Sequence, residues 1–263
     1  MSFLLSIDPL YPLSGLFVGL IVGLTGVGGG YLMTPILVLL FGVHPATAVG
    51  TDLLYAAVTK SGGTLVHGLG KTIAWRVTGL LAAGSVPTTI MTIYAIQNFG
   101  LQSAKTSALI SFMLGIALLL TSLTLLFRTQ ILAFAARHSG EDNPQRTALL
   151  TILTGAVLGV LVSISSVGAG ALGVTALLIL YPKLPVVRIV GSDIAHAVPL
   201  TLLAGIGHWW IGSVNWLLLV SLLIGSLPGI VIGSKLAPKL PEGVLRPILA
   251  GVLIIVGLRL VIA

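Results

Sequence analysis

The sequence predicts an all-α integral membrane protein made of two inverted-topology repeats. Each repeat is expected to be a glycine-broken hairpin of short helices followed by three transmembrane helices. Three observations carry this prediction. Hydrophobic residues make up 56% of the chain and charged residues only 7%, against about 25% charged residues in soluble domains. Polar and glycine motifs recur at an offset of 140 or 141 positions, and the positive charges divide unequally between the two expected faces.

The repeat consists of residue types that rarely match by chance in a chain rich in Leu, Ile, Val and Ala. Corresponding pairs are Gly50-Thr51-Asp52 with Gly191-Ser192-Asp193, His67 with His208, Trp75 with Trp216, Gly84-Ser85-x-Pro87 with Gly225-Ser226-x-Pro228, and Pro45 with Pro185. Two copies of a polar unit in a hydrophobic chain are typical of secondary transporters. We expect a first repeat over residues 1–127, a cytoplasmic linker over 128–146, and a second, inverted repeat over 147–263.

Each half divides into five apolar segments. The expected segments are 12–27, 31–43, 46–67, 74–97 and 104–127 in the first half, and 147–165, 169–181, 186–211, 214–236 and 243–262 in the second. The last three segments of each half have the roughly 20 residues that a membrane span needs. The second segment of each half has 13 residues, about 20 Å of helix, and is expected to be a half-helix that follows a glycine-rich break.

The positive charges favour inversion of the second repeat. If the first two segments of each half form a hairpin that returns to its own side, ten Lys and Arg residues lie on one face and two on the other. If they form one broken crossing, the same charges divide six to six. Because cytoplasmic loops are enriched in Lys and Arg, we expect the hairpin, both termini outside a bacterial inner membrane, and the 128–146 loop inside. The start of that loop, 131–136, is either a surface-lying amphipathic segment or plain linker.

Composition also excludes several classes of function. The chain has no cysteine, which excludes disulfides, thiolate metal sites and thiol redox chemistry. No phosphate-binding P-loop pattern is present, so the chain is not expected to drive transport with ATP by itself. No removable signal peptide is expected in residues 1–13. The net charge of +7 is attributed to cytoplasmic loops rather than to a nucleic-acid partner. We expect no cofactor and no enzymatic activity.

Two glycine-rich breaks are the main candidate site. The unpaired N–H groups of the helix after each break and the positive end of its dipole favour an anion, and nearby hydroxyls add donors. The alternative is close helix packing through small residues, which we favour for Gly15, Gly19, Gly155 and Gly159. The expected substrate-binding residues are Thr25, Gly26, Gly28, Gly29, Gly30, Thr51, Ser163, Ser165, Ser166, Gly168, Gly170 and Ser192.

The ion-coupling candidates are the ionisable residues expected within spans: Asp52, Asp193, His67, His208 and Lys60. Intramembrane carboxylates are unfavourable and usually mark ion or proton pathways. Alternatively, Thr51 and Ser192 are helix N-caps and each aspartate lies in a first helical turn. Both histidines lie near span ends, where an interfacial structural role is common. Lys60 either contacts the anion, pairs with a carboxylate or extends to the cytoplasmic face.

The glycine-rich break, the short helix with Pro35, the Pro45-Ala-x-Ala-x-Gly50-Thr51 turn and the later Gly84-Ser85-x-Pro87 resemble the TauE/SafE sulfite-exporter family, within the toluenesulfonate uptake permease superfamily, over essentially the whole chain. In the second half Ala169 replaces one glycine, and Thr175 stands where the first half has Pro35. The resemblance implies transport of small sulfur oxyanions or organosulfonates such as sulfite, often as export and coupled to an ion gradient. A passive anion channel and a membrane-embedded enzyme or assembly subunit are the alternatives. The expected partners are a small anion and the lipid bilayer; oligomeric state stays open, with a homodimer as one arrangement.

Overall fold

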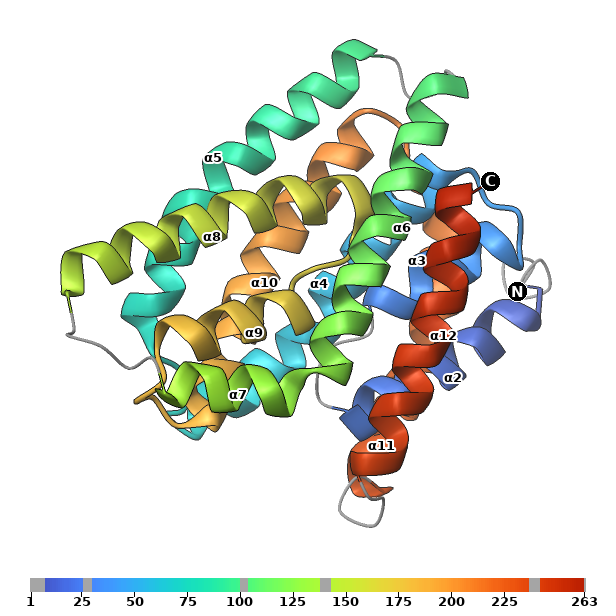
Figure 1. Cartoon of the computed structure of the whole chain (residues 1–263). Coiled ribbons are helices and arrows are strands. Elements are labelled where there is room, and N and C mark those ends of the chain that lie inside the picture. Colours follow the sequence, from blue (N-terminus) through green and yellow to red (C-terminus); the bar gives the residue numbers. More distant parts are fainter. Residues whose placement is uncertain (1–7, 26–29, 100–103, 138–142, 237–241, 263) are drawn as a thin grey trace.

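The computed structural model describes residues 8–25, 30–99, 104–137, 143–236 and 242–262, and all regular structure in these ranges is helical (Figure 1). The first half contributes α2 (Leu10–Thr25), α3 (Gly30–Leu39), α4 (Pro45–Leu69), α5 (Trp75–Phe99) and α6 (Ala104–Leu126). The second half contributes α8 (Pro144–Ser165), α9 (Ala171–Leu180), α10 (Val186–Trp210), α11 (Trp216–Leu236) and α12 (Glu242–Ile262). The predicted all-α class is confirmed.

The connection between the halves begins with a helix, α7 (Arg128–Arg137), which packs against α6 and α9. The start of this loop is therefore helical, and its expected position along the membrane surface stays a prediction. Helix α8 then begins at a capped end. The side chain of Asn143 accepts hydrogen bonds of 3.1 Å from the backbone N–H groups of Gln145 and Arg146. Pro144, at the first helical position, has no N–H that needs a partner.

Five helices in the described part of the chain are long and apolar enough to cross a membrane: Trp75–Asn98, Lys105–Leu126, Pro144–Ser165, Val186–Trp210 and Trp216–Leu236. Large apolar side chains on their outer surfaces are exposed, among them Ile90, Leu153 and Val231. Such surfaces need a lipid environment. The protein is therefore a multi-pass membrane protein. Helix α4 is as long as α10 but is more polar, because it carries an aspartate, a lysine and several hydroxyl residues.

The most extensive helix–helix contacts between the halves are those of α2 with α11 and of α5 with α8. Glycines bring these backbones close together. A Cβ atom added to Gly15 or Gly19 would overlap the backbone of α11, and one added to Gly155 or Gly159 would overlap α5. This confirms the packing role expected for these glycines, since only a residue without a side chain permits such an approach.

The two short helices, α3 and α9, have 10 residues each, or about 15 Å at 1.5 Å per residue. Neither can cross a hydrocarbon core about 30 Å thick. Figure 1 shows α9 running back beside α8, and the two helices are in contact. The expected half-helix is thus present in both halves.

Helices α4 and α10 pack against each other in the interior, and each also contacts the short helix of its own half. Two apolar cores flank this crossing. One includes Met33 and Leu37 of α3, and the other includes Leu177 and Leu178 of α9. The polar residues of α4 and α10 are therefore held between two apolar clusters, next to both short helices.

Candidate functional site

Two carboxylates lie at the crossing of α4 and α10, and neither has exposed surface. Asp52 and Asp193 are both 0% exposed. Each stands seven residues after the first residue of its helix, so almost two helical turns precede it. The alternative in which Thr51 and Ser192 are N-caps is therefore wrong. That alternative starts each helix late, because residues 45–50 and 186–191 are already helical.

Asp52 connects α4 to the short helix α3. The hydroxyl of Thr34 donates a 2.5 Å hydrogen bond to Asp52 Oδ2. The hydroxyl of Ser166, in the break before α9, also lies beside this carboxylate, although it makes no hydrogen bond in this geometry. The second oxygen, Oδ1, has no partner. Asp52 thus contacts elements from both halves of the chain and retains an unused acceptor.

Asp193 faces the beginning of α9. Its carboxylate lies near the backbone N–H of Gly170, the N-cap residue of α9, but neither oxygen has a hydrogen-bond partner. A Cβ atom at Gly173 would overlap Asp193 Oδ1, so this glycine permits the approach. A buried carboxylate without partners is stable only when it is protonated or when a cation neutralises it. Lys60 is the neighbouring cation that interacts with this carboxylate.

Lys60 supplies a cation close to both aspartates. It lies on α4, eight residues after Asp52, and so about 80° from it around the helix. Its Nζ donates a 3.0 Å hydrogen bond to the backbone oxygen of Ala169. Lys60 interacts electrostatically with Asp193 and, more weakly, with Asp52, and it is 8% exposed. Of its three expected roles, extension to the membrane surface is excluded by this burial.

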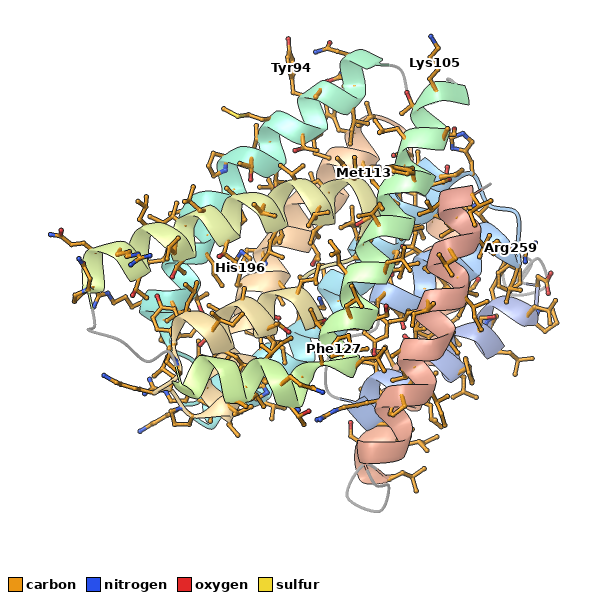
Figure 2. The ribbon with its side chains drawn as sticks, viewed as in Figure 1. Tyr94, Lys105, Met113, Phe127, His196 and Arg259 are labelled. Atoms are coloured by element: carbon orange, nitrogen blue, oxygen red, sulfur yellow. The ribbon has the colours of Figure 1, made fainter. Side chains whose placement is uncertain are left out.

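Tyr55 and His196 also belong to this polar cluster, and the sequence analysis missed both. Each stands three residues after the aspartate of its helix. His196 Nε2 lies 2.8 Å from the hydroxyl of Ser85, and the Tyr55 hydroxyl lies beside Ser226. Figure 2 shows His196 within the layers of helices. The repeat offset of 141 could have identified them, because it relates Tyr55 to His196 and Ser85 to Ser226. Matching identical residues alone overlooks a tyrosine paired with a histidine.

The second break, between α8 and α9, has a backbone that only certain residues permit. Ser166 ends α8 in the left-handed region at φ 60°, and Gly168 and Gly170 have φ values of 127° and 125°. These glycine conformations are closed to ordinary side chains. Ser163 and Ser165 donate their hydroxyl protons to carbonyls four residues earlier in α8, at 2.6 and 2.7 Å. Of the three serines, Ser166 alone has a hydroxyl without a partner.

The first break lies largely outside the described residues. Gly26, Gly28 and Gly29 fall in the gap at 26–29, while Thr25 ends α2 and Gly30 begins α3. The expectation that these residues bind the substrate stays a prediction.

Thr51 and Ser192 join their helices to the opposite half. The Thr51 hydroxyl accepts a 3.1 Å hydrogen bond from the backbone N–H of Asn215. The Ser192 hydroxyl accepts a 2.8 Å bond from the N–H of Ala74. Asn215 and Ala74 are themselves related by the offset of 141. The two hydroxyls therefore make matching contacts between halves, just before α11 and α5.

His67 and His208 make the same local contact through Nδ1 but differ in the surroundings of the rest of the ring. The Nδ1 atom of His67 lies 2.8 Å from the Thr72 hydroxyl, and that of His208 lies 3.0 Å from the Ser213 hydroxyl. His208 is fully buried, and its Nε2 lies 2.9 Å from the backbone oxygen of Ser163. His67 is partly exposed.

A cavity of about 250 Å³ runs from His67 to Asp193. Its walls come from α4, α6, α9 and α10, and its polar lining includes Arg128 and Arg246, with Gly170 beside Asp193. Apolar residues complete the wall: Leu125, Ala171, Val174, Val186, Val187, Val190 and Ile194. The cavity wall therefore brings basic side chains and the buried aspartate to one place.

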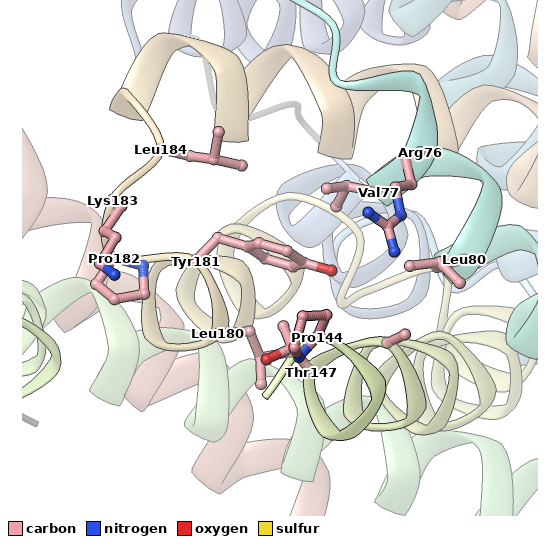
Figure 3. A pocket seen from close by; sticks show the side chains of 11 residues that line it. Arg76, Val77, Leu80, Pro144, Thr147, Leu180, Tyr181, Pro182, Lys183 and Leu184 are labelled. Atoms are coloured by element: carbon pink, nitrogen blue, oxygen red, sulfur yellow. The ribbon is translucent and has the colours of Figure 1, made fainter. Parts of the chain in front are cut away.

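A second cavity, also about 250 Å³, lies between the start of α5, the start of α8 and the α9–α10 connection (Figure 3). Arg76 and Tyr181 point toward its centre in Figure 3. The Tyr181 hydroxyl lies 2.8 Å from that of Thr151. None of the residues that line this cavity belongs to the cluster of Asp52, Asp193 and Lys60.

Among the described residues, no three His, Cys, Asp or Glu side chains come together in a way that could hold a metal ion. The arrangement that the structure does provide is a mixture of hydroxyls, two carboxylates, one amino group and a helix N-terminus. Such a set can bind a small anion or move a proton.

The chain is similar to known membrane proteins over nearly its whole length. Residues 11–260 match the family described as sulfite exporter TauE/SafE. The probable membrane transporter protein YjnA of Bacillus subtilis is 38% identical over 250 residues, which cover 95% of this chain and 98% of that protein. The probable membrane transporter protein MJ0441 of Methanocaldococcus jannaschii is 26% identical, covering 95% of this chain and 94% of that protein. No solved structure matches the chain.

Proposed function

The chain belongs to the sulfite exporter TauE/SafE family, and from this premise we propose that it is a secondary transporter of small sulfur oxyanions or organosulfonates such as sulfite. The proposed direction is export across a bacterial cytoplasmic membrane, and the proposed driving force is a proton or other ion gradient. The observation that carries the proposal is the cavity that joins basic side chains at His67, Arg128 and Arg246 to the buried cluster of Asp193, Gly170 and Lys60.

The chemistry of the cluster favours an anion at the start of α9. The backbone N–H of Gly170 and the dipole of α9 supply partial positive charge, and the Lys60 amino group lies alongside. The Ser166 hydroxyl has no partner and can donate to an oxyanion. Sulfite and sulfonate oxygens accept several hydrogen bonds at once, which matches a set of donors that converge from different elements.

Asp193 provides the proposed coupling. When ionised, its carboxylate occupies the region of positive potential near Gly170 and Lys60 and repels an incoming anion. When protonated, it leaves Lys60 and the helix N-terminus to the substrate. Binding of the anion is then linked to binding of a proton, because each makes the other more favourable. Since the two then move together, export of a dianion with one proton carries net negative charge outward, and the inside-negative membrane potential drives it. Asp52 is the proposed second carboxylate of the pathway, and His67 and His208 lie at its two ends.

Inverted repeats over residues 1–127 and 147–263 are part of the proposal. The packing supports them, because the repeat relation exchanges the α2–α11 contact with the α8–α5 contact. It also leaves the α4–α10 and α6–α12 pairs unchanged. An arrangement of this kind puts one set of elements on each side of a central site. The distribution of Lys and Arg is the reason to propose both termini outside and residues 128–146 in the cytoplasm.

Flux into and out of proteoliposomes tests the proposal. Purified protein is reconstituted, and the movement of sulfite, sulfate and a short alkylsulfonate is measured with and without an imposed pH gradient. We expect sulfite or sulfonate movement that the pH gradient accelerates, and accumulation against the anion gradient. Movement that only follows the anion gradient identifies a passive channel instead. Absence of flux for every anion, under every gradient, contradicts the proposal.

A further inference from the structure

We infer that His208 is a gate residue that holds the pathway closed at the end opposite the open cavity, and that His67 takes the same role when the protein opens the other way. This inference rests on the proposed transport function. It starts from two turns, residues 67–72 at the end of α4 and residues 208–213 at the end of α10, which we call the histidine turns. The two turns correspond in the repeat but differ in their contacts.

The equivalence of the two turns is detailed. In each turn, the histidine Nδ1 atom contacts the hydroxyl five residues later, and that hydroxyl also lies within hydrogen-bond distance of the carbonyl of the histidine. Each turn also packs on a glycine of the opposite half. A Cβ at Gly50 would collide with Ser213 and His208, and a Cβ at Gly191 would crowd His67 and Thr72. The two turns are therefore structurally equivalent.

The two copies differ in a single hydrogen bond. A carbonyl oxygen only accepts, so the Nε2 atom of His208 carries a proton and donates it to the backbone oxygen of Ser163, 2.9 Å away. Ser163 lies on the last turn of α8, three residues before the left-handed Ser166. This bond ties the end of α10 to the break that leads into α9. His67, in contrast, is part of the wall of the open cavity.

The residues around the two histidines also differ in burial, with those near His67 lining a cavity and those near His208 fully buried. Val190 and Ile194 on α10 line the cavity beside His67. The corresponding residues at the offset of 141 are Val49 and Leu53 on α4, and both are 0% exposed. One pathway is therefore open and its counterpart is packed shut, and the hydrogen bond from His208 to α8 accompanies the closed one.

By the repeat relation, the state open to the opposite side places His67 where His208 is now. The counterpart of Ser163 at the offset of 140 is Gly23, on the last turns of α2. In that state His67 Nε2 donates to the backbone near Gly23, while His208 releases Ser163. One hydrogen bond is exchanged for another, so the two states differ little in free energy, as an alternating transporter requires.

Cysteine labelling tests the inference directly, because the chain contains no cysteine of its own. Val190→Cys reports on the open pathway and Val49→Cys on the closed one. Each is placed in the full-length protein together with His208→Leu, His208→Gln or His67→Leu. Labelling by a small hydrophilic maleimide is followed in detergent and in nanodiscs. Glutamine keeps a donor near the position of Nε2, and leucine removes it.

We expect His208→Leu to raise the labelling rate of Val49→Cys by about tenfold, the effect of losing one buried hydrogen bond on a two-state equilibrium, and to lower that of Val190→Cys. His208→Gln should leave Val49→Cys protected, and His67→Leu should not expose it. Unchanged protection of Val49→Cys in His208→Leu overturns the inference. So does a rise at both cysteines together, because that pattern reports unfolding and not gate opening.

The same variants separate this inference from the proposed function. If the native protein moves no anion but His208→Leu exposes Val49→Cys selectively, the gate stands and the substrate proposal fails. If sulfite flux is present and His208→Leu exposes nothing, the gate is wrong and the transport proposal stands.

Discussion

Lys60 on α4 donates a 3.0 Å hydrogen bond to the backbone oxygen of Ala169, the residue before the N-cap of α9. This bond joins the first half of the chain to the break in the second half. The corresponding position in the second half holds Thr201, which donates instead to the carbonyl of Ala197 within its own helix. The central cluster therefore has one amino group for two aspartates, and the two breaks are not chemically equivalent.

Replacing Lys60 with methionine should weaken anion binding. Methionine fills much of the same volume but offers no donor or charge, and a hydrogen bond to a charged group contributes about 1.5–3 kcal/mol. We expect the KM for sulfite flux to rise at least about tenfold. Lys60→Arg should retain part of the affinity. Lys105→Met is the matched control, because Lys105 projects from the start of α6, away from the cluster (Figure 2). Equal KM values for Lys60→Met and the native protein would remove Lys60 from the substrate site.

Asp193→Asn should uncouple transport from the pH gradient. Asparagine imitates the protonated carboxyl in shape and charge but cannot release a proton, so anion and proton binding are no longer linked. We expect exchange of anion between the two sides to persist, while accumulation driven by a pH gradient is lost. The measurement is gradient-driven uptake beside equilibrium exchange in the same proteoliposomes. Gradient-driven accumulation that survives in Asp193→Asn assigns coupling elsewhere, with Asp52→Asn as the next variant to compare.

Gly173→Ala should disturb Asp193 without a change in charge. The added Cβ would overlap the carboxylate oxygen Oδ1, so the aspartate must move away from the start of α9. We expect a shifted pH dependence of flux in a protein that still folds. Gly251→Ala is the matched control, because no atom lies within 4 Å of the added Cβ there. Identical pH profiles for Gly173→Ala and the native protein would show that the contact has no role in coupling.

The positions of the helices were largely predictable because short-range patterns in the sequence determine them. Apolar runs bounded by proline, glycine and tryptophan gave segments that match the helices to within a few residues, including the short α3 and α9. The repeated glycines on α2 and α8 were assigned to packing, and the structure places them against α11 and α5. These features depend on residues near one another in the chain or on a repeat that the sequence displays.

The contacts within the site were less predictable because they join distant segments. Nothing local to Lys60 indicates that it reaches Ala169, 109 residues away. Thr34 bonds Asp52 from another helix, and its counterpart in the second half is an apolar residue or a threonine one position on. Ser163 and Ser165 were expected as anion donors, but their hydroxyl protons are bound within α8. A serine in a helix often donates to the backbone carbonyl oxygen of the preceding turn, and sequence alone does not tell which of three serines keeps a hydroxyl without a partner.

Gly19→Ala should destabilise the protein, although alanine is normally the better helix residue. The added Cβ would lie too close to the backbone of Ser226 on α11, and such overpacking costs about 1–3 kcal/mol. At Gly79, on the exposed side of α5, a Cβ meets nothing within 4 Å. Gly79→Ala should therefore raise stability slightly, by up to about 1 kcal/mol. Thermal unfolding in one detergent compares the two, and a Tm for Gly19→Ala equal to or above the native value contradicts the packing described here.

The proposed orientation makes opposite predictions for two exposed positions. Asn143 caps α8 at the end of the connection between the halves, and Lys105 lies at the start of α6, at the far end of the bundle (Figure 2). In the cysteine-free chain, Lys105→Cys should react with a membrane-impermeant maleimide added to intact cells. Asn143→Cys should react only after the membrane is opened, because the proposed orientation puts its loop in the cytoplasm. Permeabilised cells serve as the control that both cysteines are accessible. Labelling of Asn143→Cys in intact cells, with Lys105→Cys protected, would contradict the proposed orientation. The excess of Lys and Arg would then face outward, against the positive-inside rule.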